Sequence, residues 1–361
     1  MSVLARMASF DDDIDFRIVW RRGAALSAVL VLLGLVGIVG RGLNLGIDFE
    51  GGTSWDVPAQ ELSVDEARAA VESAGEEAAK VQTVGRGDSR IVRVQSREVT
   101  PDSEQAVSEA LAAAAGVDVE DITASSVGPS WGDQISEKAQ RALIVFFVLI
   151  TAYMAVRLEW KMAIGALAAV VHDLVISVGV YALFQLEITP ATVIAFLTIL
   201  GYSLYDTIVV FDRMQENALQ LTSNSKRTYT DMVSLSLNQV LMRSVNTTIT
   251  SLLPVVSLLV VGSSLLGAVA LQEFALALTI GLLSGAYSSI VVAAPVVAWI
   301  KEREPHNREL RARLGARAAR IESPLAPAVD GPGRPAATPG AAPNLSGRPI
   351  PPRPRKKGKR R

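Results

Sequence analysis

The sequence predicts an α-helical polytopic membrane protein with six transmembrane helices and one small α+β domain. Half of the 361 residues are hydrophobic, and they are concentrated in long uncharged runs rather than spread along the chain. A helix needs about 20 apolar residues to cross a bilayer. One polar, acidic stretch, residues 43–138, separates the first run from the others, which indicates a folded domain between the first and second spans.

Six runs are long enough to cross a membrane or can be extended until they are. The first, residues 23–40, is uncharged between two arginines, and we expect a first span at 23–42. The run 142–156 is short, but it can extend back past Arg141, whose long side chain can reach the interface. The other four runs, which complete a bundle expected at 139–300, are 162–186, 188–211, 244–272 and 274–300.

The distribution of charge predicts the orientation of these spans. Lysine and arginine in short loops mark the cytoplasmic side of a membrane. They occur before the first span, in alternate loops and after residue 300, whereas the loops near Glu187 and Glu273 have none. Residues 43–138 carry 19 acidic and 7 basic side chains, a net charge of −12. We therefore expect both termini, 1–22 and 301–361, in the cytoplasm and the acidic domain on the exported side.

The acidic domain has the pattern of a ferredoxin-like fold. A capping box at Ser63 begins one predicted helix, and Thr100 followed by Pro101 begins another. Predicted strands precede, separate and follow these helices, with "GRGD" at 85–88 as a turn. The β-α-β-β-α-β order is that of the split ferredoxin-like motif. The four expected strands are 46–57, bent at Gly51–Gly52, and 78–84, 89–96 and 121–128.

The C-terminal tail has a different composition from the rest of the chain. Residues 301–361 carry 16 basic and 5 acidic side chains, a net charge of +11. After about residue 322 the tail is rich in Pro, Ala and Gly, a composition that cannot bury a core, so we expect it to be largely disordered. Its basic end suits anionic lipid headgroups or ribosomal RNA. The alternative is a solvated tail that only fixes the topology.

Ionisable residues inside the predicted spans are the candidates for function, because a charge in a membrane is costly and is usually retained for a purpose. Asp206 interrupts the fourth span, and His172–Asp173 lies near the middle of the third. Arg243 lies at the start of the fifth. Polar neighbours at helical spacing surround these positions. They are Tyr202, Ser203 and Tyr205 beside Asp206, and Gln239, Asn246, Thr247 and Thr250 around Arg243.

These residues support two interpretations from their chemistry alone. An apolar environment favours a protonated carboxyl group, and a nearby guanidinium favours the carboxylate. A motion that brings Arg243 toward Asp206 and away again would therefore make Asp206 release and capture a proton. The alternative is a permanent salt bridge that fixes helix packing. His172–Asp173 is open in the same way, as a proton relay or as a hydrogen-bonded anchor between helices.

No motif in the sequence indicates another energy source or an enzyme. The chain has no phosphate-binding G-x-x-x-x-G-K-[ST] loop, no nucleophile elbow and no H-E-x-x-H pair. It has no cysteine and only two histidines, His172 and His306, which makes a histidine-rich or cysteine-ligated metal site implausible. We therefore expect no catalytic residues, no metal and no cofactor, with a proton gradient as the driving force.

Five motifs occur in order along the chain: "GIDFEGG" (46–52), "VGPSWG" (127–132), "HDL" (172–174), "GYSLYDTIVVFDRMQEN" (201–217) and "LMRSVNTTITS" (241–251). The first contributes Gly46, Asp48, Gly51 and Gly52, and the second contributes Gly128 and Pro129. Together they resemble the motifs of the SecF family, the smaller membrane subunits of the SecD–SecF protein-export complex. That family belongs to the resistance–nodulation–division superfamily.

The resemblance implies a location, partners and a mechanism. The chain would form half of a twelve-span unit with SecD in the bacterial plasma membrane. That unit would lie beside the SecYEG channel, with SecA on the cytoplasmic side, YajC as a further partner and a preprotein as cargo. It would use the proton motive force for late steps of translocation. The family's membrane aspartate falls on Asp206 and its arginine on Arg243.

The sequence departs from the family pattern at two positions. Tyr205 stands where asparagine is common, and Ser244 stands where threonine is common; both retain hydrogen-bonding groups. The sequence also leaves two rival functions open. One rival is a non-transporting scaffold that stabilises the channel. The other is a proton-driven small-molecule exporter of the same superfamily, which the count of six spans and one domain argues against.

Overall fold

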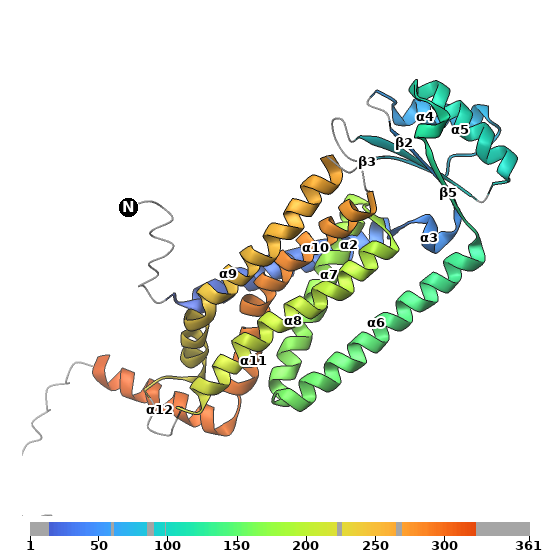
Figure 1. Cartoon of the computed structure of the whole chain (residues 1–361). Helices are drawn as coiled ribbons and strands as arrows, with labels where there is room; N and C mark the ends of the chain where they lie inside the picture. The colour runs from blue at the N-terminus through green and yellow to red at the C-terminus, as the bar shows by residue number, and fades with distance from the viewer. Residues whose placement is uncertain are drawn as a thin grey trace, which may run out of the picture. The chain divides into compact units, whose positions relative to one another are not determined.

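The computed structural model describes residues 14–58, 61–84, 90–97, 99–221, 226–264 and 269–322. In this part of the chain six helices are long and apolar enough to span a membrane, which confirms the predicted polytopic fold (Figure 1). The turn predicted at 85–88 and the basic tail after residue 322 lie outside the described residues. The spanning helices are α2 (Phe16–Arg41), α6 (Pro129–Arg157), α7 (Trp160–Phe184), α8 (Pro190–Ala218), α9 (Tyr229–Ser264) and α10 (Val269–Ser288).

Two spans begin earlier than their uncharged runs. The helix α2 begins at Phe16, where the side chain of Asp15 accepts a hydrogen bond from the Arg17 backbone amide and caps the helix. The helix α6 begins at Pro129, in the first helical position after Gly128. Residues 129–138, which we had expected in the acidic domain, are therefore the first turns of α6.

The sixth span is not a single regular helix. The helix α10 passes into a π-helical segment, η3 (Ser289–Ala293), and then into α11 (Ala294–Glu302). Single-turn π-helical insertions frequently occur at functional sites. The indole nitrogen of Trp20 on α2 donates to the backbone carbonyl of Ile290 at 3.0 Å and so satisfies one carbonyl of this segment. A further helix, α12 (Pro305–Glu322), follows.

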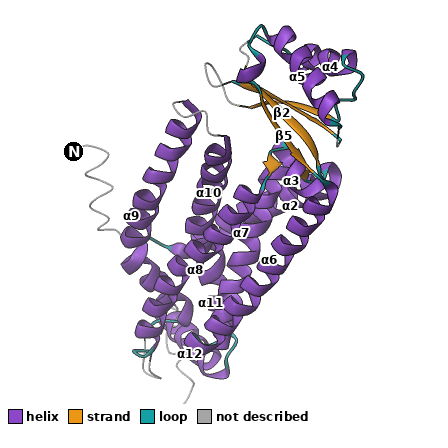
Figure 2. Ribbon diagram, turned by 45° about the vertical axis from the view of Figure 1, so that its right-hand side comes forward, coloured by secondary structure: helices purple, strands orange, loops and turns teal. Residues whose placement is uncertain are grey.

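The α+β domain has the predicted ferredoxin-like topology. Its four strands are all antiparallel and lie in the order β3-β4-β2-β5. Two helices cover one face of the sheet (Figure 2). Trp55 of the sheet is fully buried and donates from its indole nitrogen to Ser108 at 3.1 Å. The elements are β2 (Gly52–Pro58), α4 (Val64–Ser73), β3 (Lys80–Val84), β4 (Ile91–Ser96), α5 (Pro101–Ala115), η2 (Val119–Asp121) and β5 (Thr123–Val127).

The expected helix caps are present, but the first predicted strand is wrong over part of its length. Residues Ile47–Glu50 form a one-turn helix, α3, and the strand β2 begins only at Gly52. Gly51 and Gly52 have positive φ angles of 76° and 128°. Glycine adopts such angles readily, whereas a regular strand needs negative φ angles, so the chain bends here and the strand does not continue back into residues 47–50. A Cβ atom on Gly52 would also lie 2.4 Å from the carbonyl oxygen of Ser96.

A buried cluster of charges connects the sheet of this domain with the ends of the spanning helices. Arg93 on β4 forms ion pairs with Asp56 on β2 at 2.7 Å, with Glu187 at 2.8 Å and with Glu273 at 2.9 Å. Glu187 lies between α7 and α8, in the short strand β6 (Glu187–Ile188), which pairs in parallel with β1 (Asn44–Leu45). We call these four charged residues the Arg93 cluster.

Electrostatics strengthen the Arg93 cluster. Burial by itself would lower the pKa of Arg93, but Asp56 and then Glu187 outweigh it and raise that pKa well above its ordinary value. The guanidinium is therefore charged at any ordinary pH and always available to the three carboxylates.

Small residues bring the spanning helices close together. A Cβ atom on Gly179 of α7 would lie 2.4 Å from the Cα atom of Gly34 on α2, so the two backbones touch at this crossing. Close approach through small residues is a common basis of helix packing in membranes, where van der Waals contact must replace the hydrophobic effect.

Candidate functional site

Two carboxylates lie in the middle of the helical bundle, and they are the centre of the candidate site. Asp206 belongs to α8 and is half-buried, whereas Asp173 belongs to α7 and is fully buried. Among the described residues, neither forms an ion pair with a lysine or an arginine. Both are instead surrounded by hydroxyl groups from neighbouring helices.

Asp206 is held by two serines from two different helices. The Ser244 hydroxyl on α9 lies 2.8 and 2.6 Å from the two carboxylate oxygens, and the Ser289 hydroxyl of η3 lies 2.7 Å from one of them. Hydrogen bonds to a charged acceptor are roughly twice as strong as neutral ones. One carboxylate therefore links α8, α9 and the π-helical segment.

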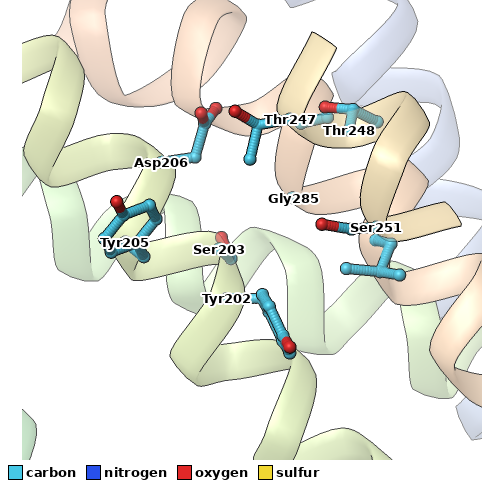
Figure 3. A pocket seen from close by; sticks show the side chains of 10 residues that line it. Tyr202, Ser203, Tyr205, Asp206, Thr247, Thr248, Ser251 and Gly285 are labelled. Carbon is cyan, nitrogen blue, oxygen red and sulfur yellow. The ribbon is translucent and has the colours of Figure 1, made fainter. Parts of the chain in front are cut away.

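A small hollow, with about 30 Å³ of room for the centres of water molecules, opens beside Asp206 between α8, α9 and α10 (Figure 3). Asp206 and Thr247 point toward one another across it. One water needs roughly 10–15 Å³ of such room, so the hollow can hold a water molecule beside the carboxylate. The lining residues are Tyr202, Ser203, Tyr205, Asp206, Thr247, Thr248, Ser251, Leu282, Gly285 and Ala286.

The structure does not bring Arg243 to Asp206, so the permanent salt bridge considered from the sequence is not present here. The Arg243 side chain is exposed on α9, and its neighbour Ser244 is the residue that reaches the carboxylate. Consecutive residues of an α-helix point about 100° apart, because a turn has 3.6 residues. When Ser244 faces Asp206, the Arg243 side chain therefore leaves the helix about 100° away from Ser244, and here it is exposed.

The predicted polar stripe of α9 divides between two places. Gln239 accepts hydrogen bonds from Arg213 at 2.7 Å and from Asn217 at 2.8 Å. These bonds connect α8 and α9 at the ends that the sequence predicts to lie on the cytoplasmic side. Thr247, one turn after Arg243, lines the hollow, whereas Asn246 is exposed. Only Thr247 of these three is close to the carboxylate.

Asp173 is the centre of a second polar network. Its carboxylate accepts hydrogen bonds from Ser203 at 2.6 Å, from Ser284 at 2.7 Å and from Ser288 at 2.7 Å. The Nδ1 atom of His172 lies 3.2 Å from the same carboxylate. Three helices, α7, α8 and α10, therefore meet at Asp173.

The serines and the tyrosine of α10 were missed in the sequence analysis. Ser288 donates to Asp173, and the next residue, Ser289, donates to Asp206, so the two networks meet at consecutive positions. The signal was available in the stretch "SGAYSSI", four hydroxyl side chains in an otherwise uncharged, apolar span. Serine and threonine are common in membrane helices, however, and periodicity alone does not show which of them face a carboxylate.

The glycine-rich motif after the first span has a structural role in the Arg93 cluster region. The backbone amide of Gly46 donates to Ile188 at 3.0 Å, and a Cβ atom at Gly46 would lie 2.7 Å from a carboxylate oxygen of Glu187. Burial, with the nearby charge of Glu187, raises the pKa of Asp48. In the second motif Gly128 precedes α6 and Pro129 is its first residue.

Comparisons with known proteins agree with this architecture. Residues 106–303 match the model of the family "Protein export membrane protein SecD/SecF, C-terminal", and residues 36–60 match "SecD/SecF GG Motif". A protein translocase subunit SecF of Streptomyces coelicolor is 43% identical over 295 residues, which cover 81% of this chain and 78% of that protein. The chain belongs to the SecF family. As a member it is a translocase subunit rather than an enzyme.

Further relatives and solved structures extend the match. SecF of Rhodothermus marinus is 34% identical, over 80% of this chain and 94% of that protein. The crystal structure of SecDF from Thermus thermophilus, described as a translocon-associated membrane protein, is 32% identical with a TM-score of 0.72. The match covers 81% of this SecF-family chain and 39% of that longer chain. SecDF in its super-membrane-facing form has a TM-score of 0.57 at 30% identity, over 85% of this chain and 40% of that one.

Proposed function

We propose that this SecF-family chain uses the proton motive force, together with SecD, to promote late steps of preprotein translocation through the SecYEG channel. The observation that supports the proposal most strongly is the environment of Asp206. A carboxylate within a membrane span, held only by hydroxyl groups and beside a hollow, can exchange a proton without breaking an ion pair.

In the proposed cycle Asp206 is the proton carrier. When the carboxylate is charged it binds Ser244 and Ser289 and so draws α9 and η3 toward α8. A protonated carboxyl group accepts hydrogen bonds less strongly, so protonation weakens both contacts. One charge that crosses a potential of 100 mV contributes about 2.3 kcal/mol, enough to bias a helix movement of this kind more than tenfold.

Arg243 has a conditional part in this proposal. A rotation of α9 about its axis by roughly one residue, about 100°, would exchange Ser244 for Arg243 in front of Asp206. The guanidinium would then favour release of the proton. In the conformation described, Arg243 is exposed beside Asn246 and is accessible to a partner, which we propose is SecD.

The proposed orientation places both termini in the cytoplasm and the α+β domain on the exported side, as the distribution of lysine and arginine predicts. In that orientation α8 runs inward, and Asp206 lies in the half of the membrane nearer the cytoplasm. The domain, with its net negative charge, would contact the emerging preprotein. SecA and YajC remain expected partners on the basis of the family resemblance, and anionic lipid is the expected partner of the basic tail.

Export of a secreted reporter tests the proposal. The reporter is followed in cells whose only SecF-type subunit carries Asp206→Asn, which keeps size and hydrogen bonding but removes the proton exchange. The matched control is Asp212→Asn on the same helix, because Asp212 is exposed. We expect export to lose its dependence on the proton gradient in the first variant and to keep it in the second, with normal levels of both membrane subunits.

Two other results would count against this function. Normal, gradient-dependent export in the Asp206→Asn strain would mean that Asp206 only packs helices, and would favour the scaffold alternative. Equal loss of export in both variants would indicate that the substitutions disturb assembly. Neither result depends on the identity of the reporter.

A further inference from the structure

The hydrogen bonds around His172 determine where its protons lie. The Tyr287 hydroxyl donates to the backbone carbonyl of Gly23 at 2.7 Å, and this bond uses the only proton of the phenol. The Ser27 hydroxyl lies 2.9 Å from the same phenol oxygen, so Ser27 must be the donor in that contact. Because the carbonyl oxygen of Gly23 can only accept, the direction of each hydrogen bond in this series is fixed.

The direction continues into the imidazole ring. Because Ser27 uses its single proton toward Tyr287, it can only accept from His172, whose Nε2 atom lies 3.2 Å away. Nε2 therefore carries a hydrogen atom. The other ring nitrogen, Nδ1, lies 3.2 Å from a carboxylate oxygen of Asp173. If His172 were neutral and Asp173 ionised, two lone pairs would face each other at this contact, inside the bundle and with no hydrogen atom between them.

We propose that His172 and Asp173 form a second proton-binding site in the bundle, which holds one proton between the two side chains in this conformation. The proton lies either on Nδ1, as an imidazolium–carboxylate pair, or on the carboxyl group, as a neutral pair. Both forms are neutral overall, which avoids the cost of an isolated buried charge. The three serine hydroxyls that donate to Asp173 favour the imidazolium–carboxylate form.

The groups around the pair are compatible with this assignment. The helix α2 contributes the uncharged Ser27, α10 contributes Tyr287, whose ring stacks on the imidazole at 6.0 Å, and α8 contributes Ser203. A second carboxylate, Asp206, is bound by Ser289, the residue after Ser288, which donates to Asp173. In the described part of the chain no lysine or arginine forms an ion pair with Asp173, so the shared proton is its only positive partner.

A route for this proton toward Asp206 passes through Ser203. The Ser203 hydroxyl donates to Asp173 at 2.6 Å and also lines the hollow beside Asp206. Once its hydroxyl turns from Asp173 toward the hollow, Ser203 can give its own proton to a water there and accept the proton of the pair, which leaves the serine unchanged and the pair with one proton fewer. This step rests on the proposed function, because it supplies the proton that Asp206 would carry. The proton-binding site at His172 and Asp173 does not rest on that function.

Nuclear magnetic resonance of the ring nitrogens tests the site directly. The chain has two histidines, so ¹⁵N-histidine labelling of this chain alone, reconstituted in lipid with its unlabelled SecD-type partner, yields two labelled imidazoles, and His306→Gln assigns the remaining signal to His172. We expect both nitrogens of His172 to be protonated near neutral pH, and Nδ1 to lose its hydrogen in the Asp173→Asn variant. A protonated Nε2 alone also supports the site if infrared spectra show a protonated carboxyl band that Asp173→Asn removes.

Two spectroscopic results would overturn the proposal. One is a neutral imidazole protonated only at Nδ1, which would reverse the donor chain from Tyr287. The other is a ring protonated only at Nε2 without a protonated carboxyl band, because the pair would then hold no shared proton. Neither result involves export. The spectra can therefore refute the shared proton of His172 and Asp173 while Asp206 remains the proposed carrier. The reporter assay with Asp206→Asn can likewise refute the role of Asp206 while the proton-binding site remains supported.

The route through Ser203 is tested with a matched pair of variants. Ser203→Ala and Ser284→Ala each remove one hydroxyl donor from Asp173, but only Ser203 lines the hollow. We expect the loss of gradient-dependent export to be several-fold greater in Ser203→Ala, with the same protonation of His172 in both. Equal losses would show that the hydroxyls only stabilise the carboxylate and would refute the route.

Discussion

Replacing Arg93 by methionine should loosen the α+β domain from the ends of the spanning helices. The Arg93 side chain is 10% exposed and is the partner of three carboxylates, of which Glu187 and Glu273 have side chains only 9% and 16% exposed. Removing one partner from a buried ion pair costs about 3–5 kcal/mol, because the remaining charges are left without compensation. Methionine keeps roughly the unbranched stem of the arginine side chain, so the loss is chiefly that of the guanidinium with its charge and hydrogen bonds.

Hydrogen exchange of the β4 backbone amides, followed by mass spectrometry, measures this loss as a local opening free energy. A change of about 3 kcal/mol or more corresponds to exchange faster by roughly a hundredfold, since each 1.4 kcal/mol is a factor of ten. The control is Arg141→Met, which breaks an ion pair with Glu137 whose side chains are 71% and 68% exposed. An exposed pair of this kind contributes less than about 0.5 kcal/mol.

Equal exchange rates in the two methionine variants would refute the reasoning, because they would show that the Arg93 cluster is screened like a surface pair. A second substitution gives an independent check. Neutralising Glu187 with glutamine in the Arg93→Met background should restore part of the protection, since the carboxylates would repel each other less. Further loss would mean that Glu187 has stabilising contacts other than Arg93.

Three further predictions concern stability. Asp48→Asn should stabilise the folded chain at pH 7. Folding raises the pKa of Asp48, so the ionised carboxylate destabilises the folded state once the pH is above the ordinary pKa near 3.8. Unfolding measurements below pH 3.8 should show no stabilisation by the substitution. Gly179→Ala should cost about 1–3 kcal/mol in thermal unfolding, because the backbone of Gly34 leaves no room, whereas Gly201→Ala, with open space around it, should not destabilise. Trp20→Phe should cost about 1–3 kcal/mol in the same measurement, because a carbonyl of the π-helical segment loses its donor.

The elements of the fold were predictable because their signals are local. Uncharged runs identified six spans, and capping residues identified the starts of helices, as at Ser63 and Thr100, where the expected hydrogen bonds are present. The order of elements was sufficient for the ferredoxin-like topology, since short connections allow few arrangements. The exception was residues 47–50, where two glycines interrupt a pattern that otherwise predicts a strand.

The candidate site was predictable only in part. That Asp206 and Asp173 matter follows from the sequence, because a carboxylate in an apolar span is costly wherever the helix packs. Their partners do not follow from it. Ser244 rather than Arg243 reaches Asp206, and Ser288 and Ser289 reach different carboxylates, because these contacts depend on the rotation of each helix about its axis. That rotation is decided by packing between helices far apart in the chain, such as the contact of Gly34 with Gly179, and no local pattern encodes it.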